Sequence, residues 1–321
     1  MDVLTTRLTR SFDVAHPVVL APMAFAAGGA LAAAVTRAGG LGLIGGGYGD
    51  AGWLDEQFAA AAGERVGVGF ITWSLARTPS LLARVLQHRP AAVMLSFGDP
   101  RPFAPQIREA GSRLICQCQE LAHVDDALAA GADVVVAQGS EAGGHGASRG
   151  TLAFVPEVAD HLARRAPDTL LLAAGGIADG RGLAAALMLG ADGVLKGTRF
   201  WAAQEALVKD GHRRAILETT GDGTLRTRLP DIVRQLPWPE PFTARIRRNA
   251  FTQRWHGHEQ ELAQAVASEG PRYRAAAEAG DAENTGVWFG EAAGLVDSIE
   301  PAADIVRMVV EGACARMRMF S

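Results

Sequence analysis

Short apolar runs that end in Gly, Pro, Ser or Gln recur along the first two thirds of the chain, with helix-like stretches between them. Runs of this length, bounded by turn-forming residues, are typical of strands that are buried on both faces, as in a parallel sheet. The eight expected strands are 18–21, 41–44, 66–71, 92–96, 114–117, 134–138, 170–174 and 194–196. Because each strand is followed by enough residues for one helix and two short loops, the pattern predicts an α/β fold of the (β/α)8 or TIM barrel type.

The segments between the runs support this prediction. Apolar residues recur at helical spacing, and a Gly or Pro follows, in 30–38, 79–87, 105–110, 121–130 and 180–189. A doubly wound open sheet is the alternative, and it requires a G-x-G-x-x-G fingerprint after the first strand. The residues that follow the first strand read APMAFAAGG, which lacks this fingerprint.

The regular pattern changes at two places. The interval between the sixth and seventh expected strands is longer than its neighbours and begins with QGSEAGGHGASRG, so we expect a functional loop there. After Phe200 the chain becomes rich in Pro and Arg, which favours a mostly helical insertion or cap. The predicted organisation is a barrel at 1–202, a cap at 203–290 and a C-terminal helix at 291–321 that returns to the barrel.

Composition narrows the possible partners. The 31 basic and 35 acidic residues give a net charge of −4 without a block of like charges, which argues against nucleic-acid binding. No apolar run has the length of a membrane helix, and the N-terminus lacks the apolar core of a signal peptide. Three cysteines, together with an isolated His256 and His258 pair, do not make a metal-binding pattern. We therefore expect a cytoplasmic protein without a metal, acting on a small molecule.

Two glycine-containing segments indicate a phosphate site. AAGGIADGRG at 173–182 and GADGVLKGTRF at 190–200 follow the seventh and eighth expected strands, where barrels commonly bind phosphate. Glycine lets backbone N–H groups approach phosphate oxygens closely, although the same glycines could simply form tight turns. Lys196 lies in the second segment, and its side chain either reaches the phosphate or is sent elsewhere by strand alternation.

His145 is the candidate catalytic residue. It lies among glycines in the long sixth loop, so a substrate could approach its ring. Histidine titrates near neutral pH, which suits it to removing a proton next to an electron-withdrawing group.

With these residues in view, the chain resembles the nitronate monooxygenases, formerly called 2-nitropropane dioxygenases, which are FMN-dependent (β/α)8 barrels. The resemblance covers about 15–200 and rests on four stretches: APM at 21–23, AGGLGLIGGG at 38–47, EAGGHG around His145, and GGIADGRGLAAALMLGADGVLKGTRF at 175–200. It extends more loosely to TGVWFGEAAGLVDSIEPAADIV near the C-terminus.

The resemblance implies a role for each matching position. His145 matches the catalytic histidine of the family. The implied FMN contacts fall into four groups: Ala21, Pro22 and Met23 against the isoalloxazine; Gln117 and Gln138 as hydrogen-bonding residues; Ala142, Gly143 and Gly144 beside the flavin; and Gly175, Gly176, Gly197 and Thr198 around the phosphate. Two departures are FAAGG at 25–29, which alters the expected substrate pocket, and Lys196, where the family commonly has an apolar residue.

The implied activity is FMN-dependent oxidation of an alkyl nitronate, or of a nitroalkane, by O2 to a carbonyl compound and nitrite. Two alternatives stay open from the sequence. One is a flavin-dependent NAD(P)H reductase acting on quinones or enoyl thioesters, and the other is a barrel that binds a phosphate ligand without redox chemistry. A homodimer is compatible with each of these three interpretations.

Overall fold

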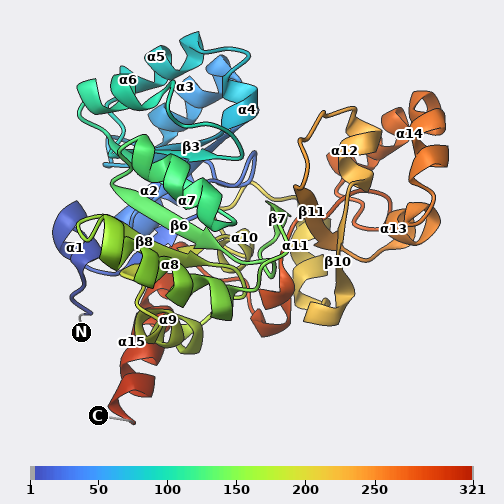
Figure 1. Ribbon diagram of the computed structural model, residues 1–321. Coiled ribbons are helices and arrows are strands. Elements are labelled where there is room, and N and C mark those ends of the chain that lie inside the picture. The colour runs from blue at the N-terminus through green and yellow to red at the C-terminus, as the bar shows by residue number, and fades with distance from the viewer. Residues whose placement is uncertain (1–3, 320–321) are drawn as a thin grey trace.

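The computed structural model describes residues 4–319, so the outermost residues of the first and last predicted segments, 1–3 and 320–321, lie outside it. Eight parallel strands form one sheet in the order β1-β9-β8-β6-β5-β4-β3-β2 (Figure 1). Their bounds are β1 Val18–Leu20, β2 Leu43–Gly47, β3 Gly67–Ile71, β4 Ala92–Ser96, β5 Arg113–Cys118, β6 Val134–Gln138, β8 Leu170–Ala174 and β9 Gly193–Lys196. All eight strands lie where the apolar runs predict them.

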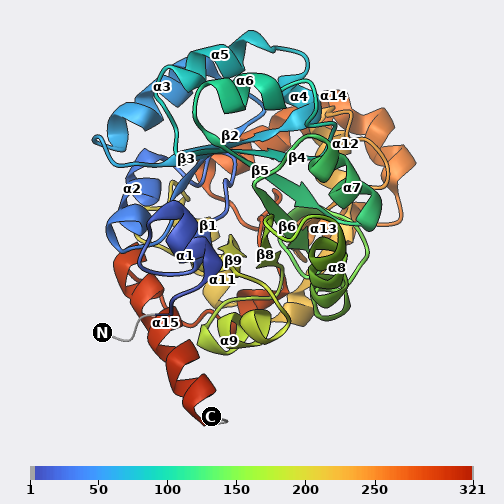
Figure 2. The ribbon, with the colours of Figure 1, turned by 60° about the vertical axis from the view of Figure 1, so that its left-hand side comes forward.

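The sheet closes on itself. Val19 in β1 forms a parallel bridge with Leu41, just before β2, and the Leu20 N–H donates to the Leu41 carbonyl at 2.9 Å. These contacts join the first and last strands of the sheet order, and Figure 2 shows the strands enclosed by the helices. The fold is therefore a (β/α)8 barrel, as the strand pattern predicts.

Strand alternation divides the apolar side chains into two layers. Leu43, Met94, Ile115 and Leu172 are among those that fill the barrel interior, and their neighbours in sequence face the surrounding helices. Both faces of each strand are thus buried, which explains why the strands are almost continuously apolar instead of alternating with polar residues.

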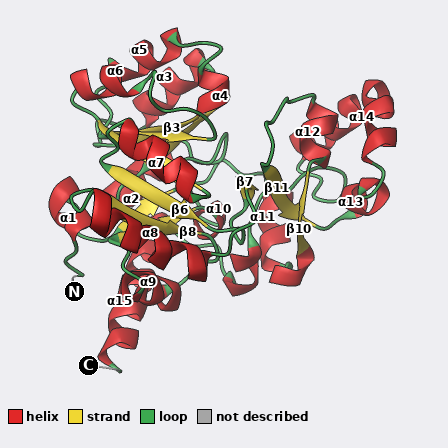
Figure 3. Ribbon diagram, in the orientation of Figure 1, coloured by secondary structure: helices red, strands yellow, loops and turns green. Residues whose placement is uncertain are grey.

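Helices surround the barrel (Figure 3), and two of them begin at an aspartate cap. Asp50 accepts a hydrogen bond from the Trp53 N–H at the start of α3, and Asp179 does the same for Arg181 and Gly182 in α9. None of the helices within residues 4–319 is long and apolar enough to cross a membrane. The helices of the barrel layer are α1 Arg7–Phe12, α2 Gly29–Arg37, α3 Ala51–Ala60, α4 Thr72–Leu75, α5 Ser80–Leu86, α6 Ala104–Glu109, α7 Leu121–Ala129, α8 Thr151–Arg165, α9 Gly180–Met188 and α15 Ala302–Arg318.

The segment 203–290 stands beside the open end of the barrel (Figure 1). It contains α11 Asp210–Leu217, α12 Leu229–Arg234, α13 Ala250–Trp255 and α14 Glu259–Ala279, a short 3-10 helix Gly221–Gly223, and two strands, β10 Thr224–Thr227 and β11 Thr243–Arg247. The helices agree with the predicted mostly helical segment, whereas the sequence pattern does not predict the strands. Both are short and arginine-containing, and they depend on a partner from the barrel.

That partner is β7 (Gly144–Gly146), which belongs to the long loop after β6. The three strands form an antiparallel sheet in the order β10-β11-β7, with His145 opposite Ala244. The chain then returns to the barrel through a 3-10 helix, Glu291–Leu295, and α15 packs against α9 and α2. The C-terminal helix begins at Ala302, after the 3-10 helix and the irregular residues 296–301, and not at 291.

Two glycines give a matched test of the packing at the barrel mouth. A Cβ on Gly45 in β2 would overlap the backbone carbonyl of Met23, whereas a Cβ on Gly52 in α3 would meet only Asp50 Oδ1 at 3.6 Å. We expect Gly45→Ala to lower the free energy of unfolding by about 1–3 kcal/mol because the backbone must shift. Gly52→Ala should leave it unchanged or raise it by up to about 1 kcal/mol, since alanine favours a helix. Urea unfolding of the two variants checks this, and equal effects would contradict it.

Candidate active site

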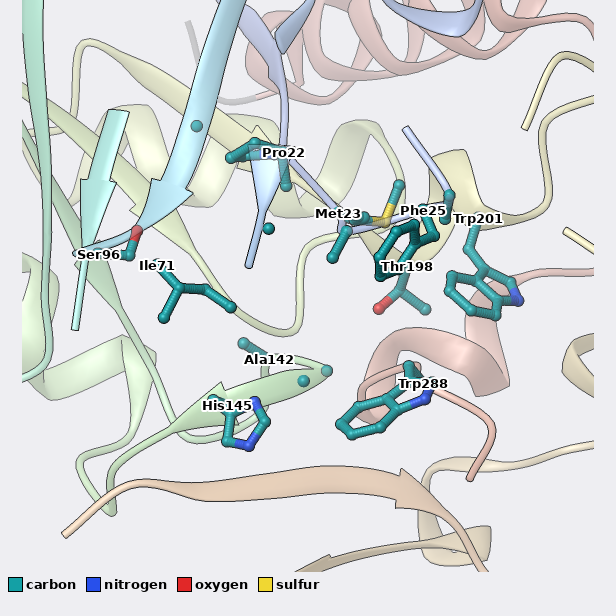
Figure 4. Close-up of a pocket in the computed structure, with 18 of the residues that line it drawn as sticks. Pro22, Met23, Phe25, Ile71, Ser96, Ala142, His145, Thr198, Trp201 and Trp288 are labelled. Atoms are coloured by element: carbon teal, nitrogen blue, oxygen red, sulfur yellow. The ribbon is translucent and has the colours of Figure 1, made fainter. Parts of the chain in front are cut away.

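A cavity of about 480 Å³ lies at the carboxyl ends of the barrel strands, between the barrel mouth and the 203–290 segment (Figure 4). This volume is in the range of cavities that bind small molecules or cofactors. The candidate site residues predicted from the sequence all line it: Ala21, Pro22, Met23, Gln117, Gln138, Ala142, Gly143, Gly144, His145, Gly175, Gly176, Lys196, Gly197 and Thr198. Positions that are up to 177 residues apart in the chain therefore meet in one place.

At the carboxyl ends of β8 and β9, glycines expose the backbone to the cavity. Gly175 and Gly176 have φ angles of 107° and 71°, which residues with a Cβ rarely adopt. A Cβ on Gly175 would also approach the Thr151 hydroxyl at 2.8 Å. Gly197 precedes the short helix α10, Thr198–Trp201, whose first N–H groups lack partners within the helix. This is the donor-rich, side-chain-free surface that a phosphate group requires.

Lys196 is buried beside this surface. Its neighbour Leu195 faces the barrel interior, so Lys196 points into the layer between the strands and the helices, where its side chain is 1% exposed. Nζ donates to the Ala178 carbonyl at 2.7 Å. The pKa of Lys196 is lowered to about 7, chiefly by burial and also by the charge of Arg199, whereas Asp179 opposes the shift. Strand alternation therefore directs the ammonium to the loop that holds Gly175 and Gly176, and a direct contact with phosphate stays a prediction.

The two glutamines at the ends of β5 and β6 differ in their surroundings. Gln138 is buried, accepts a hydrogen bond from Gln119 Nε2 at 2.8 Å and donates to the His145 carbonyl at 3.0 Å. These bonds tie the end of β6 to β7. Gln117 is half-buried and lines the cavity. In this structure Gln138 thus positions the histidine strand, while the amide of Gln117 is the more available to a ligand.

His145 makes its strongest contact with a residue that the sequence analysis misses. Its Nε2 lies 3.0 Å from both carboxylate oxygens of Asp231, in α12, and the two side chains are almost fully buried. A carboxylate only accepts hydrogen bonds, so the imidazole proton is on Nε2. Nδ1 then carries the lone pair, and it makes no hydrogen bond to any residue in the described range 4–319. The open nitrogen belongs to a ring that lines the cavity.

Burial and nearby charges set the protonation of His145. Desolvation is the largest effect and lowers its pKa; Asp231 opposes this, and the positive charges of Arg234 and Arg226 add to the lowering. The net result is a pKa below the ordinary histidine value. At neutral pH the ring is therefore neutral and able to accept a proton at Nδ1.

Aromatic side chains enclose the histidine. The Trp238 ring stacks on His145 with an interplanar angle of 5°, and Trp288 lies 5.7 Å away, centroid to centroid. Trp238 Nε1 donates to the Tyr48 hydroxyl at 3.0 Å, which connects the 203–290 segment to the loop after β2. Sequence reasoning misses these residues, although tryptophans in an otherwise charged segment are a signal that could have drawn attention to it.

No comparable signal exists for Asp231. It is 86 residues from His145, and nothing in LPDIVR distinguishes its carboxylate from a surface aspartate capping a short helix. Only the pairing of β7 with β11, and the course of α12, bring the two side chains together.

Comparison with known proteins assigns the family. The family description of nitronate monooxygenases matches residues 74–312. The chain belongs to the nitronate monooxygenase family. It is therefore an enzyme, a flavin-dependent oxidoreductase, as the resemblance of its motifs implies.

Individual relatives agree with membership of the nitronate monooxygenase family. A nitronate monooxygenase of Neurospora crassa is 34% identical, with 94% of this chain and 90% of that protein covered. Among solved structures, FabK from Thermotoga maritima has a TM-score of 0.87 at 29% identity and covers 99% of this chain and 98% of its own. A nitroalkane oxidase from Streptomyces ansochromogenes has a TM-score of 0.82 at 27% identity, covering 98% of this chain and 100% of its own.

The His145–Asp231 pair leads to a prediction for histidine ionisation. Replacing Asp231 by Asn removes the negative charge that favours the protonated ring, so we expect Asp231→Asn to lower the pKa of His145 further. NMR titration of the ring, assigned with a His145→Asn variant, measures the shift. Asp125→Asn is the matched control, because Asp125 pairs with His161 at 2.8 Å away from the cavity. A raised or unchanged pKa of His145 in Asp231→Asn would contradict the electrostatic role of the carboxylate.

The buried Lys196 leads to a second prediction, for stability. Its folded pKa of about 7 is below the ordinary lysine value of 10.5, so the unfolded chain binds more protons between these two values. The stability of the wild type relative to Lys196→Met should therefore rise with pH above about 7, with a slope of at most about 1.4 kcal/mol per pH unit. Urea unfolding across this range tests the slope. A flat profile for Lys196→Met would disprove burial of an ionisable amine.

Proposed function

We propose that the protein uses FMN and O2 to oxidise alkyl nitronates to a carbonyl compound and nitrite, and that it accepts neutral nitroalkanes through proton removal by His145. The observation that carries this proposal is the position of His145: its ring lines the cavity, its Nε2 is held by Asp231, and its Nδ1 has no hydrogen-bond partner among residues 4–319. Family membership and the similarity to a nitroalkane oxidase support the same substrate class.

Two parts of the cavity support the proposal that it binds FMN. Gly175, Gly176, Gly197 and Thr198 offer bare backbone and the start of α10 to a phosphate group. Pro22 and the neighbouring Ala21 and Met23 offer an apolar surface to a flat ring system at the barrel mouth. When bound, FMN supplies the redox chemistry by taking electrons from the substrate and passing them to O2.

His145 acts on the substrate proton. A nitronate has already lost the proton from its Cα, whereas a neutral nitroalkane must lose it before oxidation. Nδ1 accepts that proton, and the resulting imidazolium is stabilised by the Asp231 carboxylate behind the ring. The lowered pKa of His145 keeps the ring in its neutral form, able to act as a base, to lower pH than an ordinary histidine would allow.

The 203–290 segment covers the reacting face. Trp238 from this segment stacks on the histidine, and Phe97 from the barrel lies edge-on to the Trp238 ring at 5.1 Å, centroid to centroid. An apolar enclosure of this kind keeps water away from the reactive carbon and strengthens electrostatic interactions inside the cavity. Closure of the site thus depends on residues outside the barrel itself.

In the proposed mechanism His145 removes the proton and FMN supplies the redox chemistry, which leads to a kinetic prediction. We expect His145→Asn to lower kcat/KM for a neutral nitroalkane by about 100-fold or more, because the base is lost. Its effect on a preformed nitronate should be much smaller. His161→Asn is the control, since His161 also pairs with an aspartate but lies outside the cavity. Steady-state oxygen consumption with both substrate forms measures the difference.

Two outcomes would overturn the proposal. Wild-type turnover of the neutral nitroalkane by His145→Asn would remove the assigned base. Rapid anaerobic bleaching of the flavin by NADH or NADPH, combined with no bleaching by a nitronate, would assign the protein to reductase chemistry instead.

A further inference from the structure

Arg234 is a cavity residue to which the proposed mechanism gives no role. It is the last residue of α12, one turn after Asp231, and its half-buried side chain lines the same cavity as His145. The guanidinium carbon lies 5.2 Å from the ring centroid of Tyr48 and 5.6 Å from that of Trp288. Aromatic rings thus hold the guanidinium inside the cavity and leave its charge without an acidic partner.

Arg234 forms no ion pair within residues 4–319, and neither does Arg226, whose guanidinium instead donates to the carbonyls of Ser140 and Thr243. No carboxylate of that range lies within 4 Å of Arg234, whereas Arg245 pairs with Glu291 at 2.9 Å and Arg247 with Glu283 at 2.7 Å. The nearest acid along its helix, Asp231, is engaged by His145. The partners of Arg234 are the neutral side chains of Tyr48, which it hydrogen-bonds, and Trp288, so its charge in the cavity is available to an anionic ligand.

The position of Arg234 indicates which anion it meets. Trp288 lies next to both Arg234 and His145. The centroid of its ring is 5.6 Å from the guanidinium carbon of Arg234 and 5.7 Å from the ring centroid of His145. The positive charge of Arg234 is also close enough to lower the pKa of His145. Arg234 therefore belongs to the histidine side of the cavity and to the 203–290 segment, whereas the glycines suited to a phosphate belong to the barrel strands β8 and β9.

We propose that Arg234 binds the two oxygens of the substrate's nitronate group and so sets the preference of this enzyme for planar, two-oxygen anions. The inference rests on the proposed function and adds a recognition residue to it. The guanidinium presents a rigid fork of N–H donors that matches two oxygens in one plane, as in a carboxylate. With the oxygens held there, the substrate carbon lies on the side of the cavity that His145 lines.

One helix thereby supplies two opposing charges to the reaction. Asp231 stabilises the protonated form of His145, and Arg234 destabilises it while attracting the substrate anion. Because both residues lie on α12, the 203–290 segment contributes substrate recognition as well as cover.

The test uses nitrate, a planar anion that is not oxidised, as the probe. Nitrate is titrated into the FMN-loaded protein, and binding is followed by the change in visible flavin absorption and by calorimetry. We expect Arg234→Gln to raise the nitrate Kd by about 10-fold to 100-fold, the loss expected for hydrogen bonds to a charged group. Arg234→Lys keeps the charge but loses the fork, so it should raise Kd by less.

Arg77→Gln is the matched control. Arg77 also contacts a tryptophan ring, that of Trp73 at 5.0 Å, but it is exposed and lies outside the cavity. It loses the same charge, so any general effect of net charge appears in both variants. Thermal unfolding establishes that each variant is folded. A nitrate Kd in Arg234→Gln equal to that of Arg77→Gln would overturn the proposal, and so would an equal Kd in Arg234→Lys and the wild type.

Kinetics and cofactor affinity distinguish the possible anions. We expect KM to rise in Arg234→Gln for a simple alkyl nitronate and for a carboxylated nitronate alike. A rise confined to the carboxylated substrate would assign Arg234 to a distant carboxylate, and a raised Kd for FMN would assign it to the cofactor; either result overturns the proposal. If the wild type fails to oxidise nitronates while nitrate binding still depends on Arg234, the proposed function fails and the anion site stands.

Discussion

The pairing of β7 with β11 is the constraint on which the site depends. β7 is a three-residue strand in the loop after β6, and it leaves the barrel to become the edge of a separate antiparallel sheet. Its hydrogen bonds fix His145 opposite Ala244 and anchor the 203–290 segment at the barrel mouth. Because side chains alternate along a strand, a shift of one residue in this register would turn the imidazole away from the cavity.

Around this anchor, the electrostatics of the site follow from burial. A histidine deep in an apolar enclosure loses hydration, which favours its neutral form, and the carboxylate of Asp231 limits that effect while fixing the proton on Nε2. Arg234 acts in the opposite sense on the same ring. Two residues of one short helix therefore act on the ionisation of His145, so a small movement of α12 would alter it.

The other end of the cavity depends on the absence of side chains. Gly175 and Gly176 adopt left-handed backbone conformations, and Lys196 holds the following loop by its hydrogen bond to Ala178. The lysine is buried at a cost in hydration, which is the physical reason for its low pKa. A closed barrel provides the stiff support that such a loop needs, because each strand end is hydrogen-bonded to its two neighbours.

The sequence by itself determines the barrel. Strands buried on both faces must be apolar throughout, so their runs are visible without any tertiary information, and glycines at strand ends mark where a ligand needs bare backbone. The same local signals predict a role for His145 and for the glycine-containing loops after β8 and β9, and all of these residues line one cavity. The strands of the 203–290 segment are harder to predict from the sequence. β10 and β11 are short and contain polar residues, and they form a sheet only together with β7.

Only the tertiary structure decides the partners of the histidine. Asp231, Trp238 and Arg234 lie far from His145 in the chain, and each resembles an ordinary surface or core residue in its own segment. Local sequence encodes hydrogen bonding within an element, whereas the charge and shape of this cavity arise from contacts between elements that meet only after the chain has folded.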